Sequence, residues 1–258
     1  MGVLFQNDFD YSVIDQVAHR PYPMRKLPWI MTQTWHDVLF LHWPVDARVV
    51  RALLPVGLKL DLFDGQAYAA VVPFYMTNVA PRGVPALPGF SSMPEVNVRT
   101  YVTARGIPGV YFFSLDAANP LVVGAARAMF HLPYHTAEMH IDQGEDWIHY
   151  TSRRKQADGR PAELRGRYRS VGVGRHPEPG SLEYFLTERY CLYSLDDSLH
   201  MYRADIHHPP WNLTLADAEL DVNTMAGAND IPLPAVSPLA HFAKRQDVVV
   251  WPLRRVDS

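Results

Sequence analysis

The chain has 258 residues, of which 48% are hydrophobic and 20% are charged, and its formal net charge is -3. This composition predicts one globular domain with a sizeable core, and the single cysteine, Cys191, excludes an internal disulfide framework. The slightly negative charge excludes a general attraction for nucleic acid or anionic lipid. There is no apolar run long enough to span a membrane, and the N-terminal sequence lacks the basic segment and apolar core of a secretory signal. We therefore expect a cytoplasmic protein with no membrane span that acts on a small molecule.

Residues 1–28 are polar and interrupted by prolines, which predicts an N-terminal arm lying on the body of the protein. No linker, repeat or low-complexity tract divides residues 29–258, so we expect them to form a single domain.

The first core strand is predicted over residues 35–43, because the run WHDVLFLHW is rich in aromatic and aliphatic residues and is stopped by Pro44. Asp46 then precedes an apolar stripe at helical spacing. We predict a short amphipathic helix with Asp46 as its N-cap and Pro55 at its end.

Two antiparallel strands are predicted over residues 58–62 and 66–73, because Asp64-Gly65 between them supplies the turn of a hairpin. Two more strands, 95–102 and 109–115, follow a loop rich in proline and glycine. Side chains alternate along a strand, so four side chains share one face of the strand 95–102. They are Glu95, Asn97, Arg99 and Tyr101.

A second helix is predicted where Asn119 and Pro120, as N-cap and first helical residue, precede LVVGAARAMF. The helix ends before Pro133 and is followed directly by Tyr134 and His135.

The rest of the chain predicts strands over residues 136–175 around an Asp158-Gly159 turn, a short helix over 181–188 and strands over 190–206. The fold class is therefore α+β, mainly antiparallel β with a few short helices.

Several phrases of the chain, in the same order, resemble a large bacterial family of unknown function that is usually called YqjF-like (domain of unknown function 2071). Examples are PEVNVRTYV, GSLEYFLTERYCLY and IHHPPWNL. That family in turn resembles acetoacetate decarboxylase. The resemblance implies a cone-shaped antiparallel β-barrel with helices packed outside.

The resemblance to the decarboxylases also implies a pocket, and it carries their pocket glutamate onto Glu95. Their pocket segment continues through a helix to Gly-(aromatic)-Pro-Lys-Lys, where the first lysine forms a Schiff base with the keto acid. This chain has His-Leu-Pro-Tyr-His at residues 131–135, and a phenol forms no imine. The four lysines lie elsewhere: Lys26, Lys59, Lys155 and Lys244. We therefore do not expect imine chemistry.

The candidate catalytic residues are Glu95 as acid/base, with Tyr134 and His135 to stabilise or protonate an enolate. Arg99 or Arg127 would bind an anionic group, and Asn97 would line the same pocket. Without the resemblance, the polar face from Glu95 to Arg99 is more typical of a solvated sheet, and Tyr134 and His135 of a helix end.

We predict a small-molecule enzyme that acts on an oxo-acid or other carbonyl compound, with no cofactor. The alternative is a non-catalytic protein that binds a small hydrophobic or aromatic ligand. A third hypothesis, a metal hydrolase, is not favoured, because His207 and His208 are adjacent and would point to opposite faces of a strand. Antiparallel edges permit a homodimer without requiring one.

Two charged segments have simpler interpretations. The basic stretch from Arg153 to Arg175 is typical of a solvated β-ribbon, because few aromatic residues interrupt it to stack on bases. Glu183, Glu188 and Arg189 are interpreted as charges on the surface and at the end of a helix.

Overall fold

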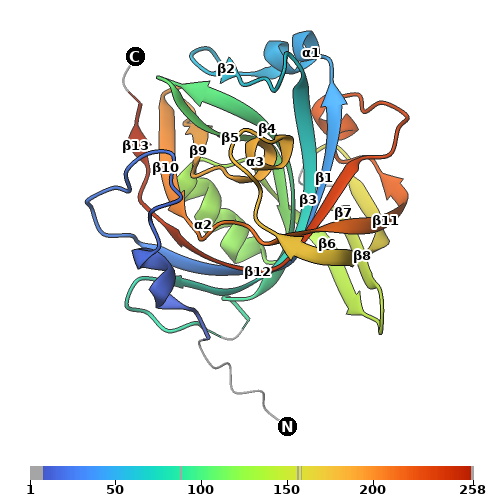
Figure 1. Cartoon of the computed structure of the whole chain (residues 1–258), viewed down its shortest axis with the longest axis horizontal. Helices are drawn as coiled ribbons and strands as arrows, with labels where there is room; N and C mark the ends of the chain where they lie inside the picture. The colour runs from blue at the N-terminus through green and yellow to red at the C-terminus, as the bar shows by residue number, and fades with distance from the viewer. Residues whose placement is uncertain (1–7, 88, 156, 158, 257–258) are drawn as a thin grey trace.

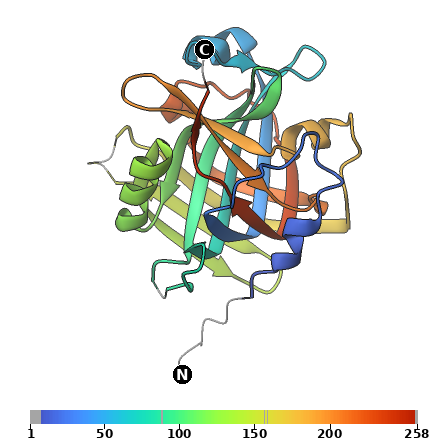
Figure 2. The same cartoon turned by 90° about the vertical axis from the view of Figure 1, so that its left-hand side faces the viewer.

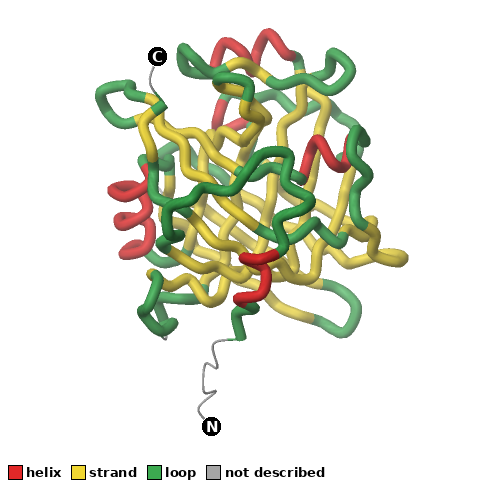
Figure 3. The backbone as a smooth tube through the Cα atoms, turned by 60° about the vertical axis from the view of Figure 1, so that its left-hand side comes forward, coloured by secondary structure: helices red, strands yellow, loops and turns green. Residues whose placement is uncertain are grey.

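The computed structural model describes residues 8–87, 89–155, 157 and 159–256. Within this part of the chain, thirteen strands form one continuous sheet, and the helices lie at its periphery (Figure 3). All strand neighbours are antiparallel except β5 with β6 and β5 with β9. The α+β class and the mainly antiparallel sheet predicted from the sequence are confirmed. No helix among the described residues is long and apolar enough to cross a membrane.

One wall of the molecule consists of β12 (Leu239–Val250), β1 (Met31–Val45), β3 (Ala67–Pro81) and β4 (Met93–Ala104), which neighbour one another in that order. On its other edge, away from β3, β4 pairs with β5 (Ile107–Ala117) along almost its whole length. These long apolar strands are the scaffold on which the rest of the sheet is built.

The sheet branches at β5, because the two halves of this strand pair with different neighbours. Val110 and Tyr111, in the first half of β5, pair with β9 (Cys191–Leu195). Residues 115–117, at its end, pair instead with β6 (Tyr134–Gln143).

A second division occurs at β12. His241 and Phe242, near its start, pair with β11 (Leu213–Asn223). Val249 and Val250, at its end, pair with β10 (Met201–His207).

The two divisions give two closed barrels that share the wall of β12, β1, β3, β4 and β5. One, which we call the pocket barrel, is completed by β9 and β10. The other, the packed barrel, is completed by β6, β7 (Ile148–Arg154), β8 (Glu163–Arg175) and β11. Two short strands, β2 (Lys59–Leu60) and β13 (Arg254–Arg255), lie at the edges.

Side-chain alternation along the shared wall decides what each barrel contains. Leu39, Leu41, Val96 and Val98 point into the packed barrel, where they meet large side chains of the opposite strands. Tyr150, Leu164 and Tyr168 supply this opposite side, and Phe242 adds to the core from the wall itself. The packed barrel is thus filled by its own core.

The first two α-helices begin at the N-caps that the sequence predicts. Helix α1 (Ala47–Leu53) begins after Asp46, whose side chain accepts a hydrogen bond from the Arg48 N–H. Helix α2 (Pro120–Phe130) begins after Asn119, and α3 (Leu182–Thr187) after Ser181, through equivalent hydrogen bonds. The described residues also form two 3-10 helices, η1 (Tyr11–Asp15) and η3 (Gly227–Asn229).

Helices α2 and α3 lie at opposite ends of the pocket barrel. Both appear within the outline of its strands in Figure 1, and on opposite sides of the molecule in Figure 2. Each end of this barrel is therefore covered by one helix.

Two strand predictions were wrong. The first core strand does not stop at Pro44 but runs to Val45, because beyond His42 it keeps only β3 as a neighbour and such an edge tolerates proline.

The hairpin expected over residues 58–73 is reduced to one bridge, between Phe63 and Gln66. Asp64 and Gly65 do form its turn with positive φ angles, but β2 pairs with β4 and not with β3. A local turn therefore did not determine the strand pairing. In the other predicted turn, Asp158 lies outside the described residues.

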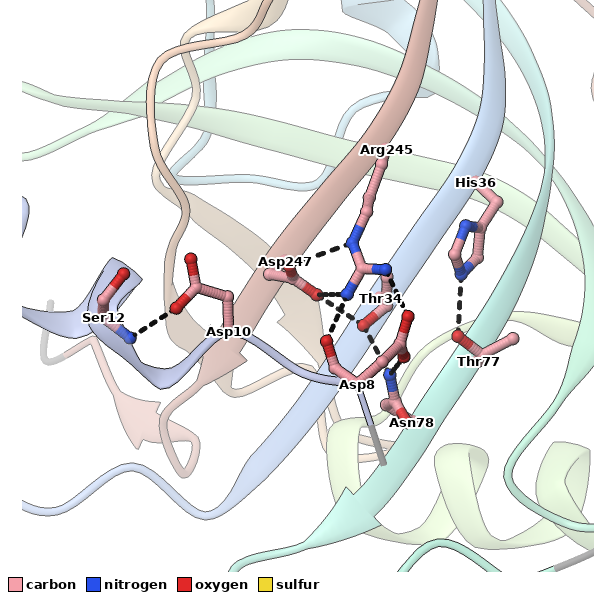
Figure 4. A network of polar contacts seen from close by, with 9 residues as sticks. All are labelled: Asp8, Asp10, Ser12, Thr34, His36, Thr77, Asn78, Arg245 and Asp247. Atoms are coloured by element: carbon pink, nitrogen blue, oxygen red, sulfur yellow. Dashed lines mark hydrogen bonds and ion pairs between the residues drawn. The ribbon is translucent and has the colours of Figure 1, made fainter. Parts of the chain in front are cut away.

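The described part of the N-terminal segment lies against β12. Asp8 forms an ion pair with Arg245 and accepts a hydrogen bond from Asn78 at 2.8 Å, and Arg245 also pairs with Asp247 at 3.2 Å (Figure 4). Phe9 packs against Trp251 in a small cluster of its own. The division into an arm and one domain at residue 28 stays a prediction.

Candidate functional site

The pocket barrel encloses a cavity of about 580 Å³. Most of its lining is apolar and comes from β1, β3, β5 and α2. A few polar side chains are also exposed to it, and the shared wall supplies three of them: Glu95, Asn97 and Arg99. A mainly apolar cavity of this size with a few convergent polar groups is typical of small-molecule sites.

Glu95 is the acidic side chain of the cavity wall, and only 3% of it is exposed. One carboxylate oxygen accepts a hydrogen bond from the Tyr134 hydroxyl at 2.7 Å, and the other accepts one from the Asn97 amide at 3.4 Å. Burial raises the pKa of Glu95 from its ordinary value of 4.5 to about 7, although both hydrogen bonds act in the opposite direction. A carboxyl group with this pKa can both give and take a proton near neutral pH.

The end of α2 positions Tyr134. His131 takes a left-handed conformation (φ 50°) that ends the helix, and Tyr134 then pairs with Leu115 at the start of β6. Arg127 of α2 donates from Nε to the Tyr134 carbonyl at 2.7 Å. Burial and the neighbouring Glu95 raise the pKa of Tyr134 well above 10, so its hydroxyl keeps the proton.

Arg99 is the most unusual side chain of the cavity, because it is 9% exposed and forms no ion pair with any described residue. One Nη donates to the Leu186 carbonyl at 3.4 Å, while Nε has no hydrogen-bond partner in the described chain. The guanidinium lies over the rings of Phe40 and Tyr101, 5.3 and 5.9 Å from their centroids. A buried guanidinium without a carboxylate is costly unless a ligand supplies the anion.

The structure does not bring His135 and Arg127 into the cavity. Neighbouring strand residues point to opposite faces, so His135 points away from Tyr134, and its ring lies beside Gly159. Arg127 is exposed on α2 and contacts the backbone of Tyr134. Of the six predicted site residues, Glu95, Asn97, Arg99 and Tyr134 line the cavity.

Other cavity residues were missed by the sequence analysis, and the prediction for two charges was wrong. Glu188 and Arg189 are buried and not at the surface. Glu188 accepts hydrogen bonds from the Tyr190 hydroxyl and from the Trp211 N–H, and Arg189 pairs with Asp61 at 2.7 Å. Trp211 and Asp61 are distant in sequence, so the local pattern of a helix end could not indicate that these charges are buried.

His208 also lines the cavity, stacked on Tyr190 with 4.6 Å between ring centroids. Burial lowers its pKa to about 4, which keeps the ring neutral. The double histidine was its only signal in the sequence. Among the described residues, no cluster of histidine, cysteine or acidic side chains could hold a metal ion.

The basic ribbon of β8 pairs with acidic side chains of β11. Arg167 pairs with Glu219 at 2.7 Å and Arg169 with Asp217 at 2.8 Å, on an exposed face. The ribbon therefore carries alternating charges of both signs.

Comparison with known proteins identifies the family. The model of DUF2071, described as an uncharacterised conserved protein, matches residues 32–247. The chain belongs to this family. It is 49% identical over 227 residues to the uncharacterised protein YqjF of Bacillus subtilis (strain 168), with 88% of this chain and 93% of YqjF covered. The YqjF-like resemblance seen in the sequence is thus confirmed.

Solved structures confirm the acetoacetate decarboxylase-like fold. An acetoacetate decarboxylase-like enzyme from Sphingomonas wittichii RW1 matches with a TM-score of 0.61 and 15% identity, covering 93% of this chain and 98% of that one. The enduracididine biosynthesis enzyme MppR, complexed with pyruvate, matches with a TM-score of 0.60 and 12% identity over 90% and 92% of the two chains. At these identities the likeness concerns the fold.

Proposed function

We propose that this DUF2071 protein is a small-molecule enzyme that moves protons at the carbon beside the carbonyl group of an oxo-acid or other carbonyl compound, without an imine. The observation that carries the proposal is the Glu95 carboxyl group, which lies in the wall of an apolar cavity with a pKa raised to about 7 and a hydrogen bond from Tyr134.

Glu95 is the acid/base of the proposed reaction. Its carboxylate accepts a proton from the carbon next to the carbonyl group, and the substrate becomes an enolate. Asn97, which already contacts this carboxyl group, would hold it in place. The proton is returned from Glu95 to the same carbon or to another position.

Tyr134 is the electrophile. In the free protein its hydroxyl donates to the Glu95 carboxylate, and that interaction weakens once Glu95 takes up a proton. The hydroxyl can then donate to the enolate oxygen, where a protonated phenol stabilises the developing charge. Arg99 would bind the carboxylate of the substrate. His135 has no part in this scheme, because its ring lies away from the cavity.

Deuterium exchange tests the proposal. Each member of a panel of oxo-acids is incubated with the protein in D₂O, and loss of the C–H signal beside the carbonyl is followed by proton NMR. Glu95→Gln should slow the catalysed exchange about 100-fold or more, since it removes the base. Glu138→Gln, which alters an exposed carboxylate of β6, is the matched control and should exchange like the wild type.

The alternative, a non-catalytic binding protein, is favoured by the apolar wall. Trp35 and Trp211 stack there with 6.0 Å between ring centroids, a surface suited to an aromatic ligand. The same experiment separates the two functions. Tight binding with no exchange above the rate of Glu95→Gln would contradict the enzyme and support the binding protein.

A further inference from the structure

We propose that the substrate is an amphipathic oxo-carboxylate that enters the pocket barrel carboxylate first and reacts at a carbon at least five C–C bonds from that carboxylate. This inference rests on the proposed function and adds to it the substrate class and the direction of binding. Four features of the cavity support it.

The α2 end of the cavity has an apolar rim. Three of the side chains that line the cavity are nevertheless strongly exposed: Leu121 at 67%, Met129 at 58% and Phe90 at 48%. Side chains that face both the cavity and solvent mark its entrance, and these are all apolar. An apolar chain can therefore remain at the entrance, whereas a carboxylate there would lose hydration without gaining a partner.

The α3 end holds the cation. Arg99 lies close to the Leu186 carbonyl of α3 and to the ring of Tyr101, the next residue on the same face of β4. Its guanidinium, which also lies over the ring of Phe40, is therefore held close to α3. Arg189, the other arginine of the cavity, already pairs with Asp61. Arg99 is thus the cation left to bind a ligand carboxylate.

Glu95 lies between the rim and Arg99. It is four residues before Arg99 on β4, which corresponds to about 13 Å between Cα atoms along a strand. Contacts of about 3 Å at each end, to the guanidinium and to the reacting C–H, leave about 7 Å between the carboxylate and the reacting carbon. With C–C bonds of about 1.5 Å, at least five bonds are needed to cover this distance of about 7 Å. In a 2-oxo acid, the C–H carbon beside the carbonyl is only two bonds from the carboxylate, so such a substrate would not reach both groups.

The size of the cavity agrees with a long ligand. A volume of about 580 Å³ is that of a site for a drug-sized molecule, and most of the remaining wall is formed by aliphatic and aromatic side chains. A ligand of about ten carbons can place its carboxylate at Arg99, its carbonyl at Glu95 and the rest of its chain along α2.

Binding tests the first half of the inference. Decanoate and 1-decanol are titrated into the protein, and the fluorescence of Trp35 and Trp211 in the cavity wall reports binding. Arg99→Gln should weaken decanoate binding about 30-fold or more and leave 1-decanol unchanged, since only decanoate carries the charge. Arg153→Gln, which removes an exposed arginine of β7, is the control, and Arg99→Lys shows whether the charge alone suffices. Equal decanoate affinity in Arg99→Gln would overturn the inference.

Deuterium exchange tests the second half, with 6-oxodecanoate and 2-oxodecanoate compared on the wild type and on Glu95→Gln. We expect 6-oxodecanoate to exchange about 100-fold faster on the wild type than on Glu95→Gln, and 2-oxodecanoate to exchange equally on both. Glu95-dependent exchange of 2-oxodecanoate at an equal or higher rate would overturn the inference and leave the proposed function standing. If neither compound shows Glu95-dependent exchange, the proposed function fails and the inference fails with it.

Discussion

The packed barrel and the pocket barrel are built on the same wall, yet one is filled with side chains and the other encloses a cavity. Both contain a buried arginine. In the packed barrel, Arg154 donates two hydrogen bonds of 2.7 Å to the carboxylate of Asp116. In the pocket barrel, Arg99 has no acidic partner among the described residues. The packed barrel thus pairs its buried arginine with an acid of the chain, whereas the pocket barrel leaves its arginine for the proposed ligand.

Strand β4 contributes side chains to the core of the packed barrel and to the cavity of the pocket barrel. Val96 and Val98 face the packed barrel. Glu95, Asn97 and Arg99 alternate with them along the strand and face the cavity. Polar side chains in alternation usually indicate a solvated face, but here both faces of the strand are buried. A polar face that is buried without being fully paired is most simply explained by a ligand.

The largest expected effect concerns the two arginines. Arg154→Met should destabilise the protein by about 3–5 kcal/mol, because it leaves the carboxylate of Asp116 buried without its partner. Arg99→Met should change the free energy of unfolding by less than about 1 kcal/mol or raise it, because no acid loses a partner. Chemical denaturation of both variants checks this, and equal losses would contradict the distinction between the barrels.

A second pair of variants compares packing. Leu41 is completely buried in the packed barrel, and Leu115 lines the cavity. Leu41→Ala should cost about 3–5 kcal/mol, because it opens a void among close neighbours. Leu115→Ala should cost about 2 kcal/mol, since part of its surface already lacks neighbours. If urea denaturation showed the same loss of unfolding free energy for Leu115→Ala as for Leu41→Ala, Leu115 would have to be fully packed and the cavity closed in solution.

A third effect depends on pH. Burial raises the pKa of Glu95 from 4.5 to about 7 in the folded state, so the fold favours the protonated carboxyl group. The corresponding stability is present below pH 4.5 and is lost as the pH rises through about 7. The free energy of unfolding of Glu95→Gln should therefore gain about 3 kcal/mol on that of the wild type between about pH 4.5 and 8. A constant difference between the two proteins across this range would contradict the raised pKa.

The sequence predicted the local features of the fold well. The N-caps Asp46 and Asn119 depend on hydrogen bonds within a few residues, and both predictions are correct. The pairing of β2 with β4 and the two closed barrels could not be predicted in this way, because they depend on contacts between distant parts of the chain. The family resemblance supplied the acetoacetate decarboxylase-like barrel instead.

In the candidate site, too, the local features could be predicted from the sequence and the contacts between distant parts of the chain could not. Glu95, Asn97 and Arg99 are spaced by two residues on one strand, so one correct assignment placed all three on the cavity side. Tyr134 and His135 are adjacent, and only the pairing of β6 with β5 decides which of them points inward. Arg189 had no local signal and His208 had only the double histidine, because their main contacts, to Asp61 and to Tyr190, are with residues distant in sequence.

The most direct test of the central claim is a titration of the Glu95 carboxyl carbon by ¹³C NMR, with Glu95→Gln used to assign the signal. The structure predicts a midpoint at about pH 7, caused by burial in the pocket barrel. Decanoate bound at Arg99 should raise this midpoint further, because a second negative charge opposes ionisation of Glu95. A midpoint near 4.5, the ordinary value for a glutamate, would contradict an acid/base group in this cavity.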